Sequence, residues 1–252
     1  MTQPAIAYPE MKKSILVLFD MAAFYLPLHG QDWKDFFTYY PVLGMVEGLI
    51  YQVEVAMEAS ETPDGSRFNL WPSKEPLIAA FLAEHQLDHP AILRYLAEVG
   101  DYFQIVHHLL LTGNPHHADV IRAAETRPAD IRLLHAILLQ LMGQAHDEAL
   151  FDILWPLEVL LDLKANLTEY ADDLVTGHYN TYQMFVKLYG SQAPHYLEAE
   201  QQRYETMLQE KLAHASFETQ QLLKDFMTCH ERHYPSVPIP APKELIMKNV
   251  FM

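Results

Sequence analysis

The stretch from Trp155 to Gly177 constrains the fold of this chain more than any other part of the sequence. Its acidic side chains recur at steps of four, seven and four residues, which place them on one face of an α-helix. These residues are Glu158, Asp162, Glu169 and Asp173. The apolar side of the stretch consists of Leu157, Leu160, Leu163, Leu167, Tyr170 and Leu174. The pattern predicts one long amphipathic helix whose apolar side other elements must cover.

Similar periodic segments fill most of the remaining chain, and Gly, Pro and helix-capping residues separate them. Short alternating runs joined by hairpin turns, which are typical of β-sheets, do not appear. The run ILVLF at 15–19 admits a strand as an alternative, but we read it as part of the first core helix. The expected helices are 14–26, 33–40, 42–60, 73–85, 88–111, 116–126, 129–142, 147–177 with a kink or restart at Pro156, 180–190, 194–214 and 216–233.

The sequence therefore predicts an all-α, single-domain multi-helix bundle over residues 1–252. A proline-containing, flexible arm is expected at 1–11 and a proline-rich tail at 234–252. The loop at 61–73 contains the turn sequence ETPDG and is the best candidate for a domain boundary. However, the helix before it is too apolar to stand alone, so one domain is the interpretation.

Charge and cysteine content narrow the classes of function. The chain has 33 acidic and 17 basic residues and a net charge of −16, which argues against a nucleic-acid partner and disfavours an anionic membrane surface. A single cysteine, Cys229, excludes an internal disulfide framework, and a cytoplasmic location is expected. No stretch approaches about 18 uninterrupted apolar residues, so no transmembrane segment is expected. Homo-oligomerisation is left open.

A second acidic stretch, at 44–60, carries Glu47, Glu54 and Glu58 among mostly apolar neighbours. Glu158 and Asp162 also lie in an apolar context, WPLEVLLDL, where a charge is costly unless it is paired or metal-bound. Two interpretations follow. Both acidic faces contact water, or they face each other across the bundle and hold Mg²⁺, which prefers carboxylate oxygens.

The segment 157–190 resembles a known family through its sequence DLKANLTEYADDLVTGHYNTY, residues 162–182. It is similar to the second acidic helix of the class I isoprenoid synthases, and within them of the squalene/phytoene synthase group. The resemblance implies a terpenoid-synthase-like bundle in which two opposed acidic helices hold Mg²⁺ and the substrate diphosphate. The metal ligands it implies are Asp162, Asn166, Glu169 and Asp173 on one side, and Glu54 and Glu58 on the other.

The chain also departs from the family pattern. It has no D-D-x-x-D, its first acidic pair is Glu rather than Asp, and the pattern N-D-x-x-S-x-x-x-E is absent because Leu167 follows Asn166 and Tyr170 takes the serine position. A diphosphate also needs positive charge. The bases proposed for it are Arg132, Lys164 and Lys187, with Arg122 and Arg127 as further candidates.

Two functions are carried forward from the sequence. The first is a helical isoprenoid-diphosphate-binding protein, with Mg²⁺-dependent prenyl transfer or cyclisation as its reaction. The alternative is a non-catalytic helical protein with degenerate metal motifs that holds a hydrophobic small molecule or a protein partner. No catalytic residue is assigned, because fold does not carry function with it.

Overall fold

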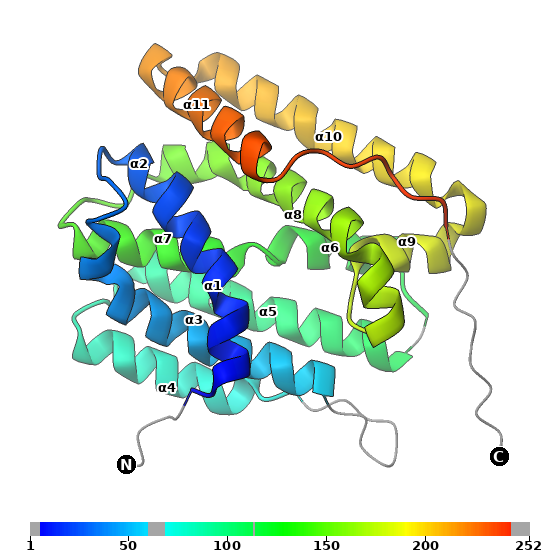
Figure 1. The fold of residues 1–252 in the computed structure, drawn as a ribbon, viewed down its shortest axis with the longest axis horizontal. Helices are drawn as coiled ribbons and strands as arrows, with labels where there is room; N and C mark the ends of the chain where they lie inside the picture. The colour runs from blue at the N-terminus through cyan, green and yellow to red at the C-terminus, as the bar shows by residue number, and fades with distance from the viewer. Residues whose placement is uncertain (1–5, 60–68, 113, 243–252) are drawn as a thin grey trace.

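A computed structural model describes residues 6–59, 69–112 and 114–242 (Figure 1). Within these ranges the chain is predominantly helical and contains no strand, which confirms the all-α prediction. The helices are α1 (Tyr8–Asp20), a π-helical turn (Met21–Tyr25), α2 (Leu26–Leu28), α3 (Phe36–Ala59), α4 (Trp71–Glu84), α5 (Pro90–Thr112), α6 (His117–Thr126), α7 (Ala129–Leu141), α8 (Glu148–Thr176), α9 (Thr181–Tyr189), a 3₁₀ turn (Gly190–Gln192), α10 (Ala193–His214) and α11 (Phe217–His233).

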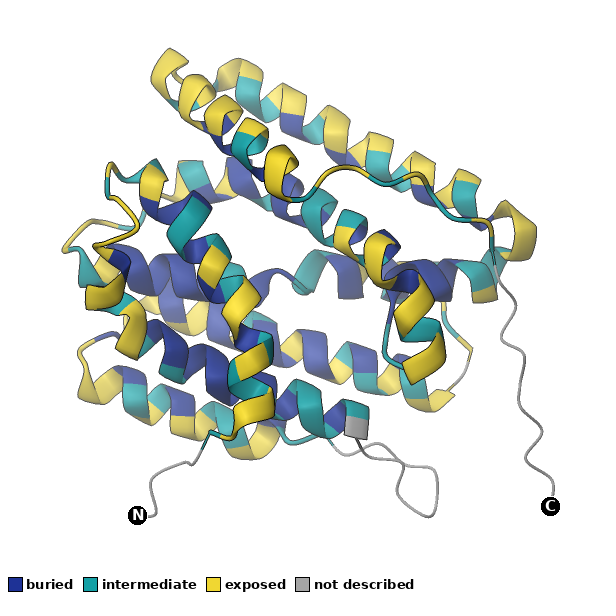
Figure 2. Ribbon diagram, viewed as in Figure 1, coloured by how far each residue is buried: buried dark blue, intermediate teal, exposed yellow. Residues whose placement is uncertain are grey.

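The long helix α8 organises the bundle. It packs along α10 and also contacts α6 and α9, while α7 packs against both α3 and α5. Helix α1 crosses the front of α3, and α11 lies near α10 beyond α8 (Figure 1). The buried residues of the helices form one hydrophobic core, and the exposed residues lie on the outer surface (Figure 2). No helix in the described ranges has both the length and the apolar character needed to cross a membrane.

Several helix ends form where the sequence indicated them. The Asp147 carboxylate accepts hydrogen bonds from the backbone N–H groups of Ala149 and Leu150, at 3.0 and 3.1 Å, and so caps α8. Gly177 ends that helix with a left-handed φ of 74°. Asn180 and Ser216 cap α9 and α11 through their side-chain oxygens. These ends depend on residues one to four positions apart, which local sequence specifies well.

Proline marks helix ends less reliably in this chain. Helix α1 begins at Tyr8, inside the arm predicted for residues 1–11, because Pro9 lies in the first turn, where no N–H group is needed. The helix predicted to end before Pro27 continues through α2 to Leu28. Helices α3 and α8 likewise continue past Pro41 and Pro156. Each proline removes one hydrogen bond, and burial of the flanking apolar residues outweighs that loss.

Two other predicted boundaries are only partly described. The predicted loop at 61–73 lies outside the described residues up to position 68, and residues 71–73 form the first turn of α4. The tail is described from Tyr234 to Pro242 and is extended. Tyr234 donates a hydrogen bond to Asp20 at 3.0 Å, and Tyr182 donates one to the Pro240 carbonyl at 2.6 Å. These contacts hold the tail against the bundle, where Figure 1 shows it in red.

One glycine is required by close packing between helices α4 and α5. A Cβ atom at Gly100 would lie 2.4 Å from Nε1 of Trp71, whose side chain is buried. That distance is well inside van der Waals contact, and Trp71 is too enclosed to move away. The absence of a side chain at Gly100 therefore sets how closely α4 and α5 approach.

Candidate functional site

A cavity of about 740 Å³ lies between α1, α3, α5, α8 and α11. We call it the acidic cavity. Its polar lining is rich in carboxylates, and the rest of its lining is apolar, with residues such as Phe103, Val106 and Leu161. The polar residues that line it are Lys13, Asp20, Tyr25, Tyr51, Glu54, Glu58, Tyr102, Arg127, Asp130, Glu158, Asp162, Lys164, Asn166, Thr168, Glu169, Asp173, His178, Tyr179, Thr181, His230, His233 and Tyr234.

All six metal ligands proposed from the sequence lie around this cavity. Glu54 and Glu58 come from α3, and the other four, Asp162, Asn166, Glu169 and Asp173, come from α8. The two acidic stretches thus face a common space. One histidine links them directly, because Nδ1 of His178 lies 3.5 Å from a Glu58 oxygen and 3.7 Å from an Asp173 oxygen.

Basic side chains already neutralise part of this acidic charge. Lys13 of α1 forms an ion pair with Glu58. Arg127, in the turn between α6 and α7, lies 2.8 Å from Asp130 and 3.6 Å from Glu54. Because Arg127 lines the cavity, it presents positive charge there among the carboxylates.

Arg127 also contacts an aromatic ring that lines the same cavity. Its guanidinium group lies 5.3 Å from the ring centre of Tyr102, a cation–π contact. A planar guanidinium offers several fixed N–H donors, which suits recognition of a phosphate. Arg127 was only one of the further candidates from the sequence, and the structure places it in the lining of the cavity.

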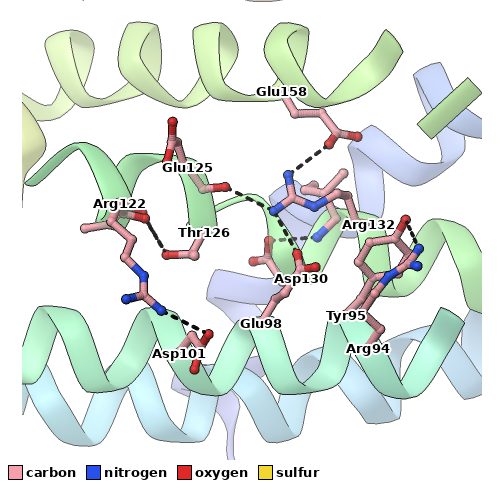
Figure 3. A network of polar contacts seen from close by, with 12 residues as sticks. Arg94, Tyr95, Glu98, Asp101, Arg122, Glu125, Thr126, Asp130, Arg132 and Glu158 are labelled. Atoms are coloured by element: carbon pink, nitrogen blue, oxygen red, sulfur yellow. Dashed lines mark hydrogen bonds and ion pairs between the residues drawn. The ribbon is translucent and has the colours of Figure 1, made fainter. Parts of the chain in front are cut away.

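The three bases put forward first for a diphosphate occupy different environments. Lys164 lines the cavity and pairs with Glu231 of α11. Arg132 is buried and does not line the cavity. Its guanidinium lies 3.5 Å from Glu158 and 3.4 Å from Glu98, and Figure 3 shows it directed at Glu158 on α8. Lys187 is exposed on α9, away from the cavity. Of these three, only Lys164 can reach a ligand in the acidic cavity as the side chains stand.

Asn166 is engaged in holding helices together. Its side-chain oxygen accepts a hydrogen bond from the Thr181 N–H at 2.7 Å, and its Nδ2 donates to the Asp162 carboxylate at 3.2 Å. Asn180 donates two further hydrogen bonds, to the Asn166 carbonyl at 2.7 Å and to the Asp173 carboxylate at 2.8 Å. The pair Asn166–Asn180, which we call the asparagine brace, therefore orients two cavity carboxylates and joins the end of α8 to the start of α9.

Burial raises the pKa of the carboxyl groups deepest in this region. It raises the pKa of Glu158 to about 7, although Arg132 and the hydroxyl of Tyr25 act in the opposite direction. Burial likewise raises the pKa of Asp162 to about 7, against the opposing charge of Arg127. Withdrawal from water is also the main cause of the raised pKa values of Glu54, Glu169 and Asp173. A cation placed among these groups would favour their charged forms and release protons.

Glu47 differs from the other members of the first acidic face. It is 0 % exposed, neither of its carboxylate oxygens has a hydrogen-bond partner, and it does not line the cavity. Burial is the main cause that raises its pKa well above the usual range, and the negative charge of Asp130 adds to the effect. Glu47 therefore lies on the side of α3 that is buried in the protein interior, whereas Glu54 and Glu58 line the cavity.

Sequence reasoning missed several residues of the site. The cavity is also lined by residues that were not proposed, namely Lys13, Asp20, His178, Tyr25, Tyr51 and Tyr102. His178 carries the one usable signal, because it directly follows Gly177, the predicted end of the acidic helix. The remaining residues come from other helices, and their patterns are those of ordinary core or surface positions.

The donor set suits a hard divalent cation, although the side chains are not arranged around one. Carboxylates from α3 and α8 are the ligand type that Mg²⁺ prefers. Within the described part of the chain, no group of three or more His, Cys, Asp or Glu side chains is arranged to hold a metal ion. Lys13 and His178 lie beside Glu58, and Arg127 lies beside Glu54, so metal binding would have to displace these cations.

A second depression, of about 870 Å³, lies where the start of α8 meets α2, α10 and α11. Its lining includes His29, Asp147, Asp152, Lys211 and His214, and it contains none of the site residues proposed from the sequence. Its carboxylates are Asp147 and Asp152 at the start of α8 and Glu210 on α10, and the acidic pairs of α3 and α8 lie elsewhere. The acidic cavity is therefore the candidate functional site.

Comparison with known proteins identified no relative of this chain. A scan against protein-family models, a search of the curated proteins and a search of the solved structures each returned no match.

Proposed function

We propose that the acidic cavity binds an isoprenoid diphosphate together with Mg²⁺. The observation that carries this proposal is the position of the carboxylates of α3 and α8, which face one cavity whose remaining lining is largely apolar. Such a cavity suits an amphiphile with a strongly anionic head and a hydrocarbon chain. A pocket for a purely apolar molecule would not enclose so many carboxyl groups, because each of them costs free energy when it is removed from water.

Five carboxylates would hold the metal: Glu54, Glu58, Asp162, Glu169 and Asp173. Bound Mg²⁺ would supply the positive charge that a diphosphate needs. Lys13 and His178 would then leave the carboxylate of Glu58 and become free to meet the anion. Asn166 serves better as a brace than as a ligand, since its oxygen already accepts the Thr181 N–H.

The proposed reaction class is prenyl transfer or cyclisation. Arg127 and Lys164 would bind the diphosphate through charge-assisted hydrogen bonds and orient it. The apolar lining would keep water from the hydrocarbon chain. The rings of Tyr25, Tyr51 and Tyr102, which line the cavity, would favour positive charge developing on that chain.

The alternative is a non-catalytic protein that holds a hydrophobic ligand in the same cavity. One observation favours it: Lys13, Arg127 and His178 compensate Glu54, Glu58 and Asp173 within the protein itself. Because these basic side chains form ion pairs with the carboxylates, the carboxylates have counter-charges without a bound metal. The missing D-D-x-x-D points in the same direction.

Thermal melting separates the two functions. The full chain is melted alone, with MgCl₂, with farnesyl diphosphate, and with both. Saturation at about 100 times the dissociation constant stabilises the folded state by about 2.7 kcal/mol, and we expect that shift only when both are present. Release of inorganic diphosphate in the same mixture would mark turnover, whereas a shift without release supports a binding protein.

A pair of adjacent variants tests the site itself. Asp173→Asn removes a cavity carboxylate and should abolish at least half of the ligand-induced shift. Asp172→Asn is the matched control, because Asp172 is exposed, does not line the cavity and carries the same charge. The proposal fails if Mg²⁺ and farnesyl diphosphate together produce no shift in the unaltered chain, or if the two variants behave alike.

A further inference from the structure

The C-terminal tail forms part of the wall of the acidic cavity. Residues 234–242, which we call the strap, run from the end of α11 to α9 (Figure 1). Tyr234, Pro235 and Val237 of the strap line the cavity. The centre of the Tyr234 ring lies 4.8 Å from that of His230, another residue of the lining. The first residues of the strap therefore lie against the aromatic part of the cavity lining.

Four prolines keep the strap from continuing α11. They have no backbone N–H group, so they cannot donate the hydrogen bonds that a helix requires. These residues are Pro235, Pro238, Pro240 and Pro242. Every residue of the strap is at least partly exposed. A segment without fully buried residues or helical hydrogen bonds opens at a lower free-energy cost than the packed helices that form most of the cavity wall.

Hydrogen bonds to two helices hold the strap in place. The Tyr234 hydroxyl donates to Asp20 of α1 at 3.0 Å. Near the other end, the Tyr182 hydroxyl of α9 donates to the Pro240 carbonyl at 2.6 Å. Because the net contribution of one such bond to stability is modest, these attachments position the strap without fixing it permanently.

A further attachment connects the strap to a basic side chain of the cavity. The Glu231 carboxylate, in the last turn of α11, accepts a hydrogen bond from the Ser236 N–H at 2.8 Å. The same side chain forms an ion pair with Lys164 of α8, which lines the cavity. One carboxylate thus joins the strap to a base in the cavity wall.

We propose that the strap is a movable cover of the acidic cavity, and that its release from α1 and α9 opens the cavity to a ligand. The identity of that ligand rests on the proposed function, whereas the movement of the strap does not. Two properties coincide in this segment: it forms part of the cavity lining, and it is attached by a few side-chain hydrogen bonds. A tail with a purely structural role would stabilise the fold without controlling access to the cavity.

Thiol labelling inside the cavity tests this movement without metal or isoprenoid. Val106 is buried and lines the cavity. Since the chain has a single cysteine, Val106→Cys combined with Cys229→Ser places its sole thiol inside the cavity. N-ethylmaleimide is a small neutral reagent that the carboxylates do not repel. Its rate of labelling reports how often the interior becomes accessible.

Two variants release the strap in this background. Tyr182→Phe/Tyr234→Phe removes both hydroxyl groups that hold it and keeps both rings, so labelling should become about tenfold faster. Glu231→Ala removes the acceptor of the Ser236 N–H at an exposed position and should change the rate in the same direction. Melting curves confirm that each variant is folded.

A second pair of tyrosines provides the matched control. Tyr189→Phe/Tyr204→Phe removes two hydroxyl groups that bond to His117 and Glu125, and neither tyrosine lines the cavity. The labelling rate should not change in this variant.

Two results would overturn the proposal. Equal labelling rates in the release variants and their background would show that access does not depend on the strap. Equal acceleration in the control would assign the effect to general loosening of the bundle. Because labelling uses no ligand, it can succeed while the melting shift with Mg²⁺ and farnesyl diphosphate fails, and the reverse.

Discussion

At the scale of single residues, the buried Glu158 shows how much a partner matters. Its apolar neighbours in the sequence predicted that this carboxylate would need pairing or a metal. In the structure the Tyr25 hydroxyl donates to it at 2.9 Å, and Arg132 lies 3.5 Å away. Tyr25 lies 133 positions away in the sequence, so no local pattern could have identified it. Even with these partners, burial keeps the pKa of Glu158 raised to about 7.

This raised pKa predicts how stability depends on pH. A carboxyl group with a folded pKa of about 7 and an ordinary value of 4.5 stabilises the fold fully below pH 4.5. That contribution is lost as the pH rises to about 7. In Glu158→Gln, the difference in unfolding free energy between pH 5 and pH 8 should shrink by about 2–3 kcal/mol. Urea denaturation at both pH values measures it, with the exposed Glu198→Gln as control, and an unchanged difference in Glu158→Gln would contradict the assignment.

At the scale of helices, the joint between α8 and α9 matters most for the site. Gly177 ends α8, and Asn180 starts α9 by accepting from the Gln183 N–H at 3.1 Å. The same Asn180 side chain donates to Asp173 and to the Asn166 carbonyl. The sequence identified Asn180 as a cap, whereas its second role in orienting a cavity carboxylate follows from packing alone.

The two roles of Asn180 can be separated by comparing two caps. Asp147→Ala removes an exposed cap of α8 and should cost about 1 kcal/mol of stability. Asn180→Ala removes a buried cap and also leaves the Asn166 carbonyl without this donor, so it should cost about 2–4 kcal/mol. Chemical denaturation of both variants provides the comparison. Equal losses would show that the asparagine brace adds nothing beyond capping.

At the scale of the whole molecule, like charges repel one another. The chain has a net charge of −16, and several of its carboxylates line one cavity. Lys13, Arg127 and His178 offset part of this repulsion, but acids still outnumber bases along the lining. Burial of the hydrophobic core that the helices share opposes this repulsion in the folded state. This excess of carboxylates is the reason why the proposed function assigns a divalent cation to the cavity.

Self-repulsion predicts that salt stabilises the protein. Raising NaCl from 0.05 to 0.5 M should raise the thermal midpoint by several degrees, since about 1 kcal/mol corresponds to about 2–4 °C for a chain of this size. The double variant Glu54→Gln/Glu169→Gln carries less cavity charge and should gain less from salt. A midpoint that falls with salt, or an equal gain in both proteins, would be inconsistent with repulsion centred on the cavity.

The sequence by itself determined the helical class, most helix ends and the polar face of each acidic helix. These features depend on contacts within about one helical turn, such as the cap at Asp147 and the left-handed Gly177. Tertiary structure alone decided that Glu54 and Glu58 line the same cavity as Asp162 and Asp173, that Arg127 lies among them, and that the buried Arg132 pairs with Glu158. The reason is physical: helical periodicity defines the direction in which a side chain points, and only the packing of distant helices determines what lies opposite it.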